Sequence, residues 1–453
     1  MPVPLIESLA TTEPLAAIFS DHSVLQAMLD FEIALARAEA DLRVIPHSAA
    51  RAIVKAARVE RFDVVALARE ALRAGTPAIP LVKSLRKKVQ RDDDASAAFV
   101  HWGATSQDVS DTALILLLKK SAAILEHSLD RLEHSLQSLV GKYKHTVMLG
   151  RTLLQPAPPI TFGLKAAGWL GSIRRGRLRL RLTLAEALVL QFGGASGTLA
   201  ALGSHGIEIG EAVAKQLKLS NPDAPWHTHR DRLAAVVCAC GVLTGSLGKM
   251  ARDVSLLMQA EVGEASEPGG SGRGGSSTMP QKHNPIASAI TLAAAQRVPG
   301  LVANFLSQMN QEHERAVGGS QAEWSTIAAV IQSTGVAIDS MAEVAEGLTV
   351  NEARMRKNIE ATRGTIFAEK AALLLSRKLG RENAHRLLEQ ATDPGQLRDH
   401  TLAEVLAQMP EIQYYHNKGV LSAFDDPEEY LGVAREFAER LSSPNKKRPH
   451  RRK

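Results

Sequence analysis

Residues 274–285 read Gly-Gly-Ser-Ser-Thr-Met-Pro-Gln-Lys-His-Asn-Pro, and an apolar, helix-forming segment stands on each side of them. The glycines that lead into this stretch are conformationally permissive because they carry no Cβ, whereas Pro280 and Pro285 restrict its exit. A mobile segment that ends in a fixed cluster of hydroxyl, amine and amide groups is what a closing active-site loop requires. A solvated Gly/Ser linker is the alternative, and Met279 together with the two prolines argues against it.

The chain on either side of this loop has the periodicity of long helices. Apolar residues spaced 4, 3, 4, 3 occur twice, as Leu125, Leu129, Leu132, Leu136 and Leu139 and as Leu243, Leu247, Met250, Val254 and Leu257. Such heptad-like seams predict long helices packed in a bundle. Glycines at 241, 245 and 248 predict close packing along the second helix.

Further helices are expected at 24–42, from Ile286 onward and at 324–348. Pro299 is expected to kink the helix that contains it, because proline removes one backbone hydrogen bond and crowds the preceding turn. No alternation of period two recurs over consecutive segments, so little sheet is expected. The sequence therefore predicts an all-α chain with a long central helical bundle.

At 453 residues the chain is too long for a single ordinary core. Helix lengths and proline positions divide it into an N-terminal helical domain (1–110), a central bundle domain (111–350), a C-terminal helical domain (351–443) and a basic tail (444–453). The tail holds six Lys and Arg residues and no acid, which accounts for the whole net charge of +6. We expect it to be disordered and solvated. No other stretch combines basic residues with aromatics, so no nucleic-acid partner is expected.

The bulk composition indicates a soluble globular protein, with 45% hydrophobic and 23% charged residues. No apolar run approaches the roughly 18 residues of a membrane span, so no membrane association is expected, and the N-terminus lacks a signal peptide's pattern. Cys238 and Cys240 are interpreted as small buried hydrophobes in a reducing, cytoplasmic setting. His227 and His229 point to different faces of a helix, so no metal and no cofactor are expected.

Two further polar clusters stand before and after the first long helix. Residues 101–108 read His-Trp-Gly-Ala-Thr-Ser-Gln-Asp, and residues 150–156 read Gly-Arg-Thr-Leu-Leu-Gln-Pro. The first can cap the following helix, and a helix N-terminus attracts anions. An ordinary N-cap explains it equally well. The second lies at the junction of two helices and by itself is only a turn.

Together the three clusters resemble the signature regions of the fumarase/aspartase superfamily, whose loop pattern is Gly-Ser-Ser-x-Met-Pro-x-Lys-x-Asn-Pro. Every defined position of that pattern is present in 275–285. The resemblance continues through 191–198, 313–320 and 363–369, and so covers nearly the whole chain. It implies a three-domain, all-α fold and a homotetramer whose active sites each collect the three regions from three subunits.

The resemblance also implies the roles of the site residues. Ser276 would be the base that moves a proton at the carbon next to a substrate carboxylate, with Lys282 and Asn284 holding the carboxylate on which charge accumulates. Hydrogen bonds and charge from the remaining residues would bind a small tricarboxylate substrate. These substrate-binding residues are His101, Thr105, Ser106, Gln155, Met279, Arg315 and Ser320.

One departure from the family pattern separates two branches of the superfamily. Its lyases carry a histidine, the acid for the leaving group, where this chain has Leu153. Leucine transfers no proton, whereas a lactonising enzyme, whose reacting group is a carboxylate, has less need of an acid there. Residues 101–108, 225–232 and 272–276 are also similar to the lactonising branch. A carbon–nitrogen lyase remains the alternative, and intact Ser276, Lys282 and Asn284 argue against a purely structural protein.

Overall fold

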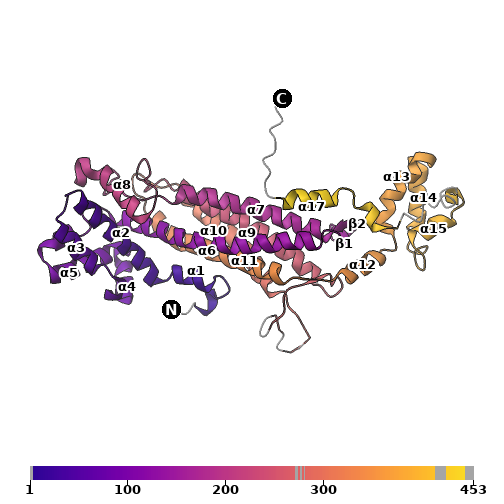
Figure 1. Ribbon diagram of the computed structural model, residues 1–453, viewed down its shortest axis with the longest axis horizontal. Coiled ribbons are helices and arrows are strands. Elements are labelled where there is room, and N and C mark those ends of the chain that lie inside the picture. Colours follow the sequence, from indigo (N-terminus) through magenta and orange to yellow (C-terminus); the bar gives the residue numbers. More distant parts are fainter. Residues whose placement is uncertain (1–3, 271–273, 276–277, 280, 414–424, 444–453) are drawn as a thin grey trace, which may run out of the picture. The chain divides into compact units, whose positions relative to one another are not determined.

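The structure is a computed structural model that describes residues 4–270, 274–275, 278–279, 281–413 and 425–443. Helices make up most of these residues, and strands form two small antiparallel sheets, as the ribbon in Figure 1 shows. The predicted all-α fold class is confirmed. The basic tail lies outside the described residues.

The chain forms two compact units. The first comprises 1–130, 175–248 and 290–340, and the second comprises 131–174, 249–289 and 341–453. The boundaries of these units fall inside long helices. The three-part division expected from the sequence stays a prediction.

Connections of varied length join the helices and strands, and several of them contain 3-10 turns. In chain order they are α1 Glu13–Ile18, α2 Asp21–Asp41, α3 His47–Ala56, α4 Val64–Ala74, α5 Ala78–Asp92, α6 Ser106–Lys142, β1 Val147–Thr152, β2 Gln155–Thr161, α7 Phe162–Ala187, α8 Gly206–Leu217, α9 Asp231–Leu257, β3 Ala265–Ser266, α10 Ile286–Ser307, α11 Gly319–Gly347, β4 Thr349–Val350, α12 Glu352–Glu360, α13 Ala368–Leu379, α14 Arg381–Ala391, α15 Leu402–Gln408 and α17 Ala434–Ser442.

Both predicted leucine-rich seams are buried. Leu125 and Leu132 on α6 are 1% and 0% exposed, and Leu243 and Leu247 on α9 are each 0% exposed. A side chain in place of Gly248 would bring its Cβ to 2.6 Å from the Cβ of Ala295. Gly248 therefore permits close packing against α10, and so does Gly241, where a Cβ would lie 3.0 Å from the Val302 side chain, whereas a Cβ at Gly245 would meet nothing within 4 Å.

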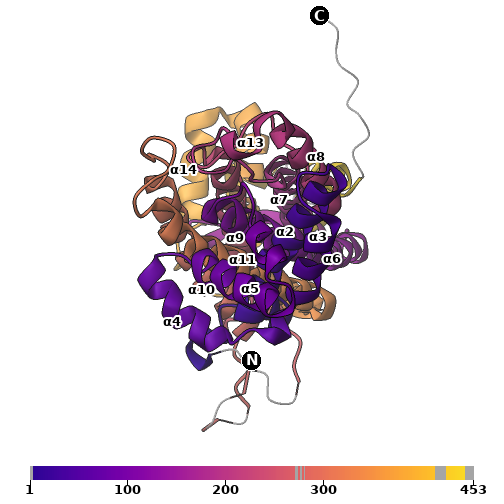
Figure 2. The same ribbon diagram turned by 90° about the vertical axis from the view of Figure 1, so that its left-hand side faces the viewer.

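Helices α2, α3, α5 and α8 of the first unit share one apolar core with the start of α6, and Figure 2 shows these N-terminal helices facing the viewer. Helix α2 begins after Ser20, whose hydroxyl accepts a hydrogen bond from the Ser23 N–H at 3.3 Å. Alanines and long apolar side chains make up most of its buried faces. The core holds α2 and α3 as a packed pair in the same unit as the first signature region.

The segment at 150–156 differs from its sequence interpretation as a simple turn between helices. It is the tip of a β-hairpin, in which Arg151 of β1 pairs with Pro156 of β2. Leu153 and Leu154 form the turn with positive φ angles of 50° and 66°. Residues with a Cβ rarely adopt this region because of steric crowding. The alternating strand pattern was missed because glycine and three prolines occupy positions that usually hold β-formers.

Three helices are long and apolar enough to cross a membrane by length and composition, namely α9, α10 and α11, with mean hydropathies of 1.6, 1.4 and 1.2. The expectation that no apolar segment is long enough to span a membrane is therefore wrong. Burial explains the apolarity of α9 and α11, whose most apolar windows are 61% and 72% buried. The corresponding window of α10 is only 28% buried within the chain.

Neither cysteine of α9 forms a disulfide. Cys240 is fully buried, and burial raises the pKa of its thiol to about 12. Cys238 is half-buried. Cys240 therefore behaves as the small hydrophobe that the sequence predicts, and Cys238 does so only in part.

Candidate active site

The turn at 101–108 leads into α6, and its conformation depends on one carboxylate. Helix α6 begins at Ser106, and the Asp108 side chain reaches back to accept a hydrogen bond from the Thr105 N–H at 3.0 Å. His101 and Gly103 have positive φ angles of 62° and 70°. The predicted helix cap is therefore real, with Asp108 as the side chain that makes it.

Asp108 does more than cap a helix, because its carboxylate is fully buried and accepts three further hydrogen bonds. One oxygen accepts from the Gly193 N–H at 3.0 Å and from His227 Nε2 at 2.8 Å. The other accepts from the Gly194 N–H at 2.9 Å as well as from Thr105. Each oxygen therefore has two donors, as a buried carboxylate requires. Asp108 joins the 101–108 turn to the 193–194 turn and to His227.

Arg315 lies against both turns that Asp108 holds. Its Nη1 donates to the Thr105 hydroxyl at 2.8 Å, and its Nη2 donates to the carbonyl oxygens of Gly194 at 3.2 Å and Ala195 at 3.0 Å. Thr105 and Arg315 are 210 residues apart in the chain. The structure thus brings together two of the residues that the family resemblance assigns to substrate binding.

A cavity of about 520 Å³ opens beside this guanidinium. Its volume falls within the range of about 300–1,000 Å³ that is typical of small-molecule sites. Three of the predicted substrate-binding residues line it, Ser106, Arg315 and Ser320. Its other lining residues are Ala71, Leu72, Ala74, Gly75, Thr76, Pro77, Ile79, Gln107, Ser110, Ala316, Gln321 and Trp324. Hydroxyls, two amides and one cation on a partly apolar wall suit a small anionic ligand.

His101 has a buried ionic partner in α2. Its Nδ1 lies 2.6 Å from Oε1 of Glu32, whose side chain is 1% exposed. Burial alone would lower the imidazole pKa, but the charge and hydrogen bond of Glu32, with a further contribution from Asp108, raise the pKa of His101 above its usual value of 6.5. The raised pKa favours the protonated imidazole, whose second ring nitrogen then carries a proton.

A second buried network supports the same corner of the first unit. The Arg230 guanidinium is buried between Asp111 and Glu323, with Nη1 at 2.8 Å from Asp111 Oδ2 and Nη2 at 2.5 Å from Glu323 Oε2. Glu323 also accepts from Gln311 Nε2 at 2.8 Å, which ties α11 to the segment that carries Arg315. Within the ranges that the structure describes, no three His, Cys, Asp or Glu side chains are grouped as a metal ion would need.

The hairpin that carries Gln155 belongs to the second unit and is held by a paired arginine. Arg151 donates to both oxygens of the buried Glu264 carboxylate, at 2.9 and 2.7 Å. Asn358 Nδ2 donates to the same carboxylate at 2.7 Å. A bidentate arginine pair of this kind fixes orientation as well as distance. Gln155, the first residue of β2, pairs with Thr152 and is exposed.

The loop at 274–285 also belongs to the second unit. Its two ends meet where the Asn284 N–H donates to the Gly274 carbonyl at 2.9 Å. Gly274 has a φ of +67°, and a Cβ there would lie 2.7 Å from the Asn284 carbonyl oxygen, so glycine is required. Lys282 and Met279 are exposed and Asn284 is half-buried. Ser276, the predicted base, lies outside the described residues.

Glu267 fixes the exit of this loop. Its carboxylate accepts from the backbone N–H groups of Ala287 at 3.1 Å and Ser288 at 2.8 Å, in the first turn of α10. Such N–H groups have no partner within their own helix, and a negative charge at this end of a helix is favourable. The segment that carries Lys282 and Asn284 is therefore anchored at its C-terminal end.

Sequence reasoning missed the side chains that support the predicted ligands, namely Glu32, Glu264, Glu267 and the full role of Asp108. Asp108 lies within a polar cluster, and Glu264 and Glu267 lie shortly before the 274–285 loop, whereas Glu32 lies near none of the clusters and has no signal in the sequence. The predicted residues themselves divide between the units: His101, Thr105, Ser106, Arg315 and Ser320 lie in the first, and Gln155, Met279, Lys282 and Asn284 in the second. Their assembly into one site stays a prediction.

Comparison with known proteins places this fold and these motifs in one class of enzyme. Residues 7–300 match the family described as Lyase, and residues 364–441 match the family described as Adenylosuccinate lyase C-terminus. The first match spans more than half of the chain, so the chain belongs to this lyase family of the fumarase/aspartase superfamily.

Individual relatives narrow this class. Over 438 residues, and 97% of each chain, the sequence is 45% identical to the 3-carboxy-cis,cis-muconate cycloisomerase of Bradyrhizobium diazoefficiens. The crystal structure of 3-carboxy-cis,cis-muconate lactonizing enzyme from Pseudomonas putida matches with a TM-score of 0.91 and 44% identity, covering 97% of this chain and 98% of that one. A nitrosuccinate lyase of Streptomyces davaonensis is 40% identical over 99% of this chain and 96% of its own.

Proposed function

We propose that this protein is a lactonising enzyme that converts 3-carboxy-cis,cis-muconate to 4-carboxymuconolactone in the protocatechuate branch of aromatic catabolism. The observation that carries the proposal is the near full-length similarity to cycloisomerases of that name, at 45% identity and with a TM-score of 0.91 for the solved enzyme. The same proposal includes a cytoplasmic location, with which the absence of a disulfide at Cys238 and Cys240 agrees.

The reaction joins a carboxylate oxygen to one carbon of a conjugated double bond and adds a proton to the neighbouring carbon. That second carbon lies next to another carboxylate, which accepts the electron pair of the broken π bond and becomes a dianionic intermediate. Ser276 then gives its hydroxyl proton to this carbon. Lys282 and Asn284 hold the carboxylate on which the negative charge accumulates.

Most of the groups that hold the remaining carboxylates belong to the first unit, and Gln155 belongs to the second. Arg315, Thr105 and Ser106 present a guanidinium and hydroxyls beside the 520 Å³ cavity, and Gln155 adds an amide. His101, with its pKa raised by Glu32, contributes a further N–H donor or positive charge. A tricarboxylate needs several such donors, because each buried carboxylate oxygen must be paired.

The test of the mechanism is Ser276→Ala, with Ser277→Ala as the matched control. Loss of a general acid or base costs roughly 10²–10⁴-fold in rate, so turnover of 3-carboxymuconate by Ser276→Ala should fall by that factor while KM changes little. Ser277→Ala should have a smaller effect. An inactive Ser277→Ala beside an active Ser276→Ala would mean that the neighbouring serine donates the proton, and activity in both variants would refute the mechanism.

A carbon–nitrogen lyase similar to adenylosuccinate lyase is the second candidate, favoured by the match of 364–441 to the C-terminal family of that enzyme. Absorbance assays with 3-carboxymuconate and with adenylosuccinate separate the two activities. Leu153→His restores the lyase acid and should not raise lactonising activity, because that reaction has no leaving group to protonate at this position. Turnover of adenylosuccinate alone would overturn the proposal.

We further propose that the protein is a homotetramer in which several subunits contribute to each active site. The most apolar window of α10 is only 28% buried within one chain, and a large exposed apolar surface marks an interface. In the second unit, Leu153 and Leu154 at the hairpin tip are 97% and 75% exposed. Sedimentation that shows a stable monomer at micromolar concentration would contradict it.

A further inference from the structure

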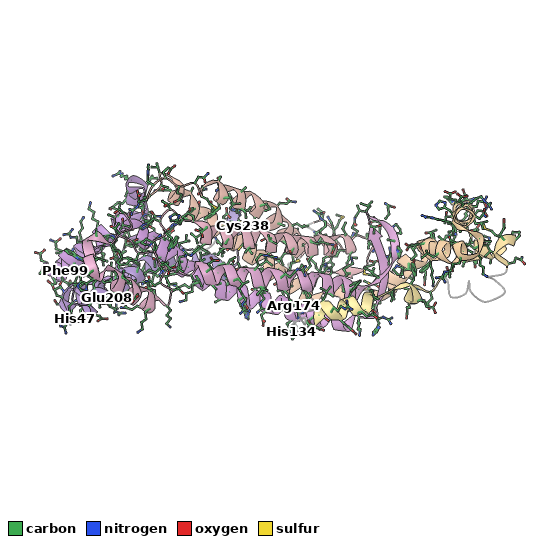
Figure 3. The ribbon with its side chains drawn as sticks, turned by 90° about the horizontal axis from the view of Figure 1, so that it is seen from above. His47, Phe99, His134, Arg174, Glu208 and Cys238 are labelled. Atoms are coloured by element: carbon green, nitrogen blue, oxygen red, sulfur yellow. The ribbon has the colours of Figure 1, made fainter. Side chains whose placement is uncertain are left out.

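A second cavity, of about 420 Å³, lies between α2 and α3 of the first unit. It shares no lining residue with the cavity beside Arg315. Its walls are Arg37, Ala40 and Asp41 of α2, then His47, Ala50, Arg51, Val54 and Lys55 of α3, and Arg58 just beyond α3. Figure 3 shows His47 at the edge of this unit. We call this cavity the α2–α3 groove.

The groove is strongly cationic. Three guanidiniums, one ammonium and one imidazole line it against a single acid, Asp41. The i, i+4 spacing of His47, Arg51 and Lys55 places these three on one side of α3, and Arg58 follows just after the helix ends. The whole chain outside the basic tail has no net charge, so this local excess of positive charge is not a consequence of a basic protein.

The arginines of the groove are not used to hold the fold. Among the described residues, Arg37, Arg51 and Arg58 have no ion pair or side-chain hydrogen bond, and all three are exposed. Lys55 differs from them, because it is paired with Asp92 at 3.1 Å. Helix α3 also begins without a side-chain cap and without an acid in its first turn, which leaves its N-terminal dipole unopposed. Like charges are thus gathered in a concave site with little to neutralise them.

We propose that the α2–α3 groove binds a small polyanion with two or more carboxylate or phosphate groups, as an accessory site separate from the catalytic one. Guanidinium forks match carboxylate and phosphate oxygens in a bidentate geometry. A volume of about 420 Å³ admits a metabolite-sized ligand. The alanine and valine floor has no aromatic ring on which a base would stack, so the site favours a compact anion over a single-stranded nucleic acid.

The experiment is isothermal titration of the full chain at low ionic strength with two probes, inorganic tripolyphosphate and citrate. Wild type is compared with Arg37→Gln/Arg51→Gln and with a control, Arg69→Gln/Arg86→Gln, which removes the same charge from exposed positions of α4 and α5. We expect the groove variant to lose about tenfold or more in affinity, equivalent to about 1.4 kcal/mol, and the control to lose less than about twofold.

Activity separates the groove from the catalytic cavity. The groove variant should keep the lactonising activity of wild type, because none of its substituted residues lines the cavity beside Arg315. The probe that binds more tightly identifies carboxylate or phosphate as the preferred group. Equal losses of affinity in both double variants would show a diffuse charge effect, and no binding to wild type at millimolar probe would show no site. Either result would overturn the inference.

Discussion

Asp108→Asn is the substitution that most directly tests how the first unit holds its substrate-binding groups. The Asp108 carboxylate is fully buried and accepts four hydrogen bonds, two on each oxygen. Asparagine has the same shape but replaces one oxygen by a donor group. Two of the four partners, Thr105 and Gly194, in turn hold Arg315.

The cost follows from which oxygen the new amide nitrogen replaces. If the amide nitrogen faces Thr105 and Gly194, it meets two backbone N–H groups, which can only donate hydrogen bonds. If the amide nitrogen faces His227 and Gly193, only the Gly193 N–H is left without an acceptor, because the His227 imidazole can accept a hydrogen bond after a change of tautomer. The second orientation is therefore preferred. One buried unpaired N–H costs about 1–3 kcal/mol. The hydrogen bonds from the Thr105 and Gly194 N–H groups each weaken by about 1 kcal/mol, because the oxygen that accepts them is no longer charged. The expected loss is about 3–5 kcal/mol in the free energy of unfolding.

The assay has two parts, urea denaturation and steady-state turnover of 3-carboxymuconate. Asp130→Asn is the matched control on the same helix, because Asp130 is exposed and pairs with Arg177 at 3.1 Å, and an exposed pair of this kind contributes about 0–1 kcal/mol. For Asp108→Asn we expect KM to rise by about tenfold or more, because an arginine held by charge-assisted hydrogen bonds loses its supports. If Asp108→Asn denatures and turns over like Asp130→Asn, the buried carboxylate does not position this site.

Two further predictions concern pH. Burial, reinforced by the charge of Glu32, raises the pKa of Glu39 from 4.5 to about 9. The folded chain then binds more protons than the unfolded chain between these values, so the free energy of unfolding should fall as pH rises through that window. Glu39→Gln should remove this dependence, and denaturation curves that keep a constant gap between wild type and variant from pH 5 to pH 9 would contradict it. The pKa of His101 is raised above 6.5 by Glu32, so its contribution to stability is complete below pH 6.5 and lost as pH rises through the folded-state pKa. The excess stability of wild type over Glu32→Gln should therefore shrink at alkaline pH, and the His101 proton resonances should titrate at lower pH in the variant.

Features that depend on local spacing are predictable from the sequence alone. The seams at 125–139 and 243–257 predict long helices because apolar residues must recur every three or four positions to stay on one helix face. Helices at 106–142 and 231–257 confirm them. The loop at 274–285 was recognisable because its glycines, prolines and polar residues are contiguous. This loop and the two other polar clusters, at 101–108 and 150–156, were enough to indicate the fumarase/aspartase superfamily.

Prediction from sequence is weaker where the same residue pattern is compatible with more than one structure. From the sequence, the segment at 150–156 is interpreted as a turn, because prolines and glycine obscure the strand pattern. Only the pairing of β1 with β2 shows that it is the tip of a hairpin. Helices α9 and α11 are more apolar than expected, and their burial within the chain accounts for that apolarity. Composition alone does not separate a buried bundle helix from a spanning one.

The groups that support the predicted ligands become visible only in the folded chain. Asp108 meets His227 across 119 residues, Arg151 meets Glu264 across 113, and His101 meets Glu32 across 69. The Arg37, Arg51 and Arg58 side chains are likewise unremarkable in the sequence, and their grouping in one groove depends on how α2 packs on α3. Hydrogen bonds and ion pairs of this kind depend on distance and direction in space. No periodicity along the chain encodes them, because each partner can lie in any other element that the core brings within about 3 Å.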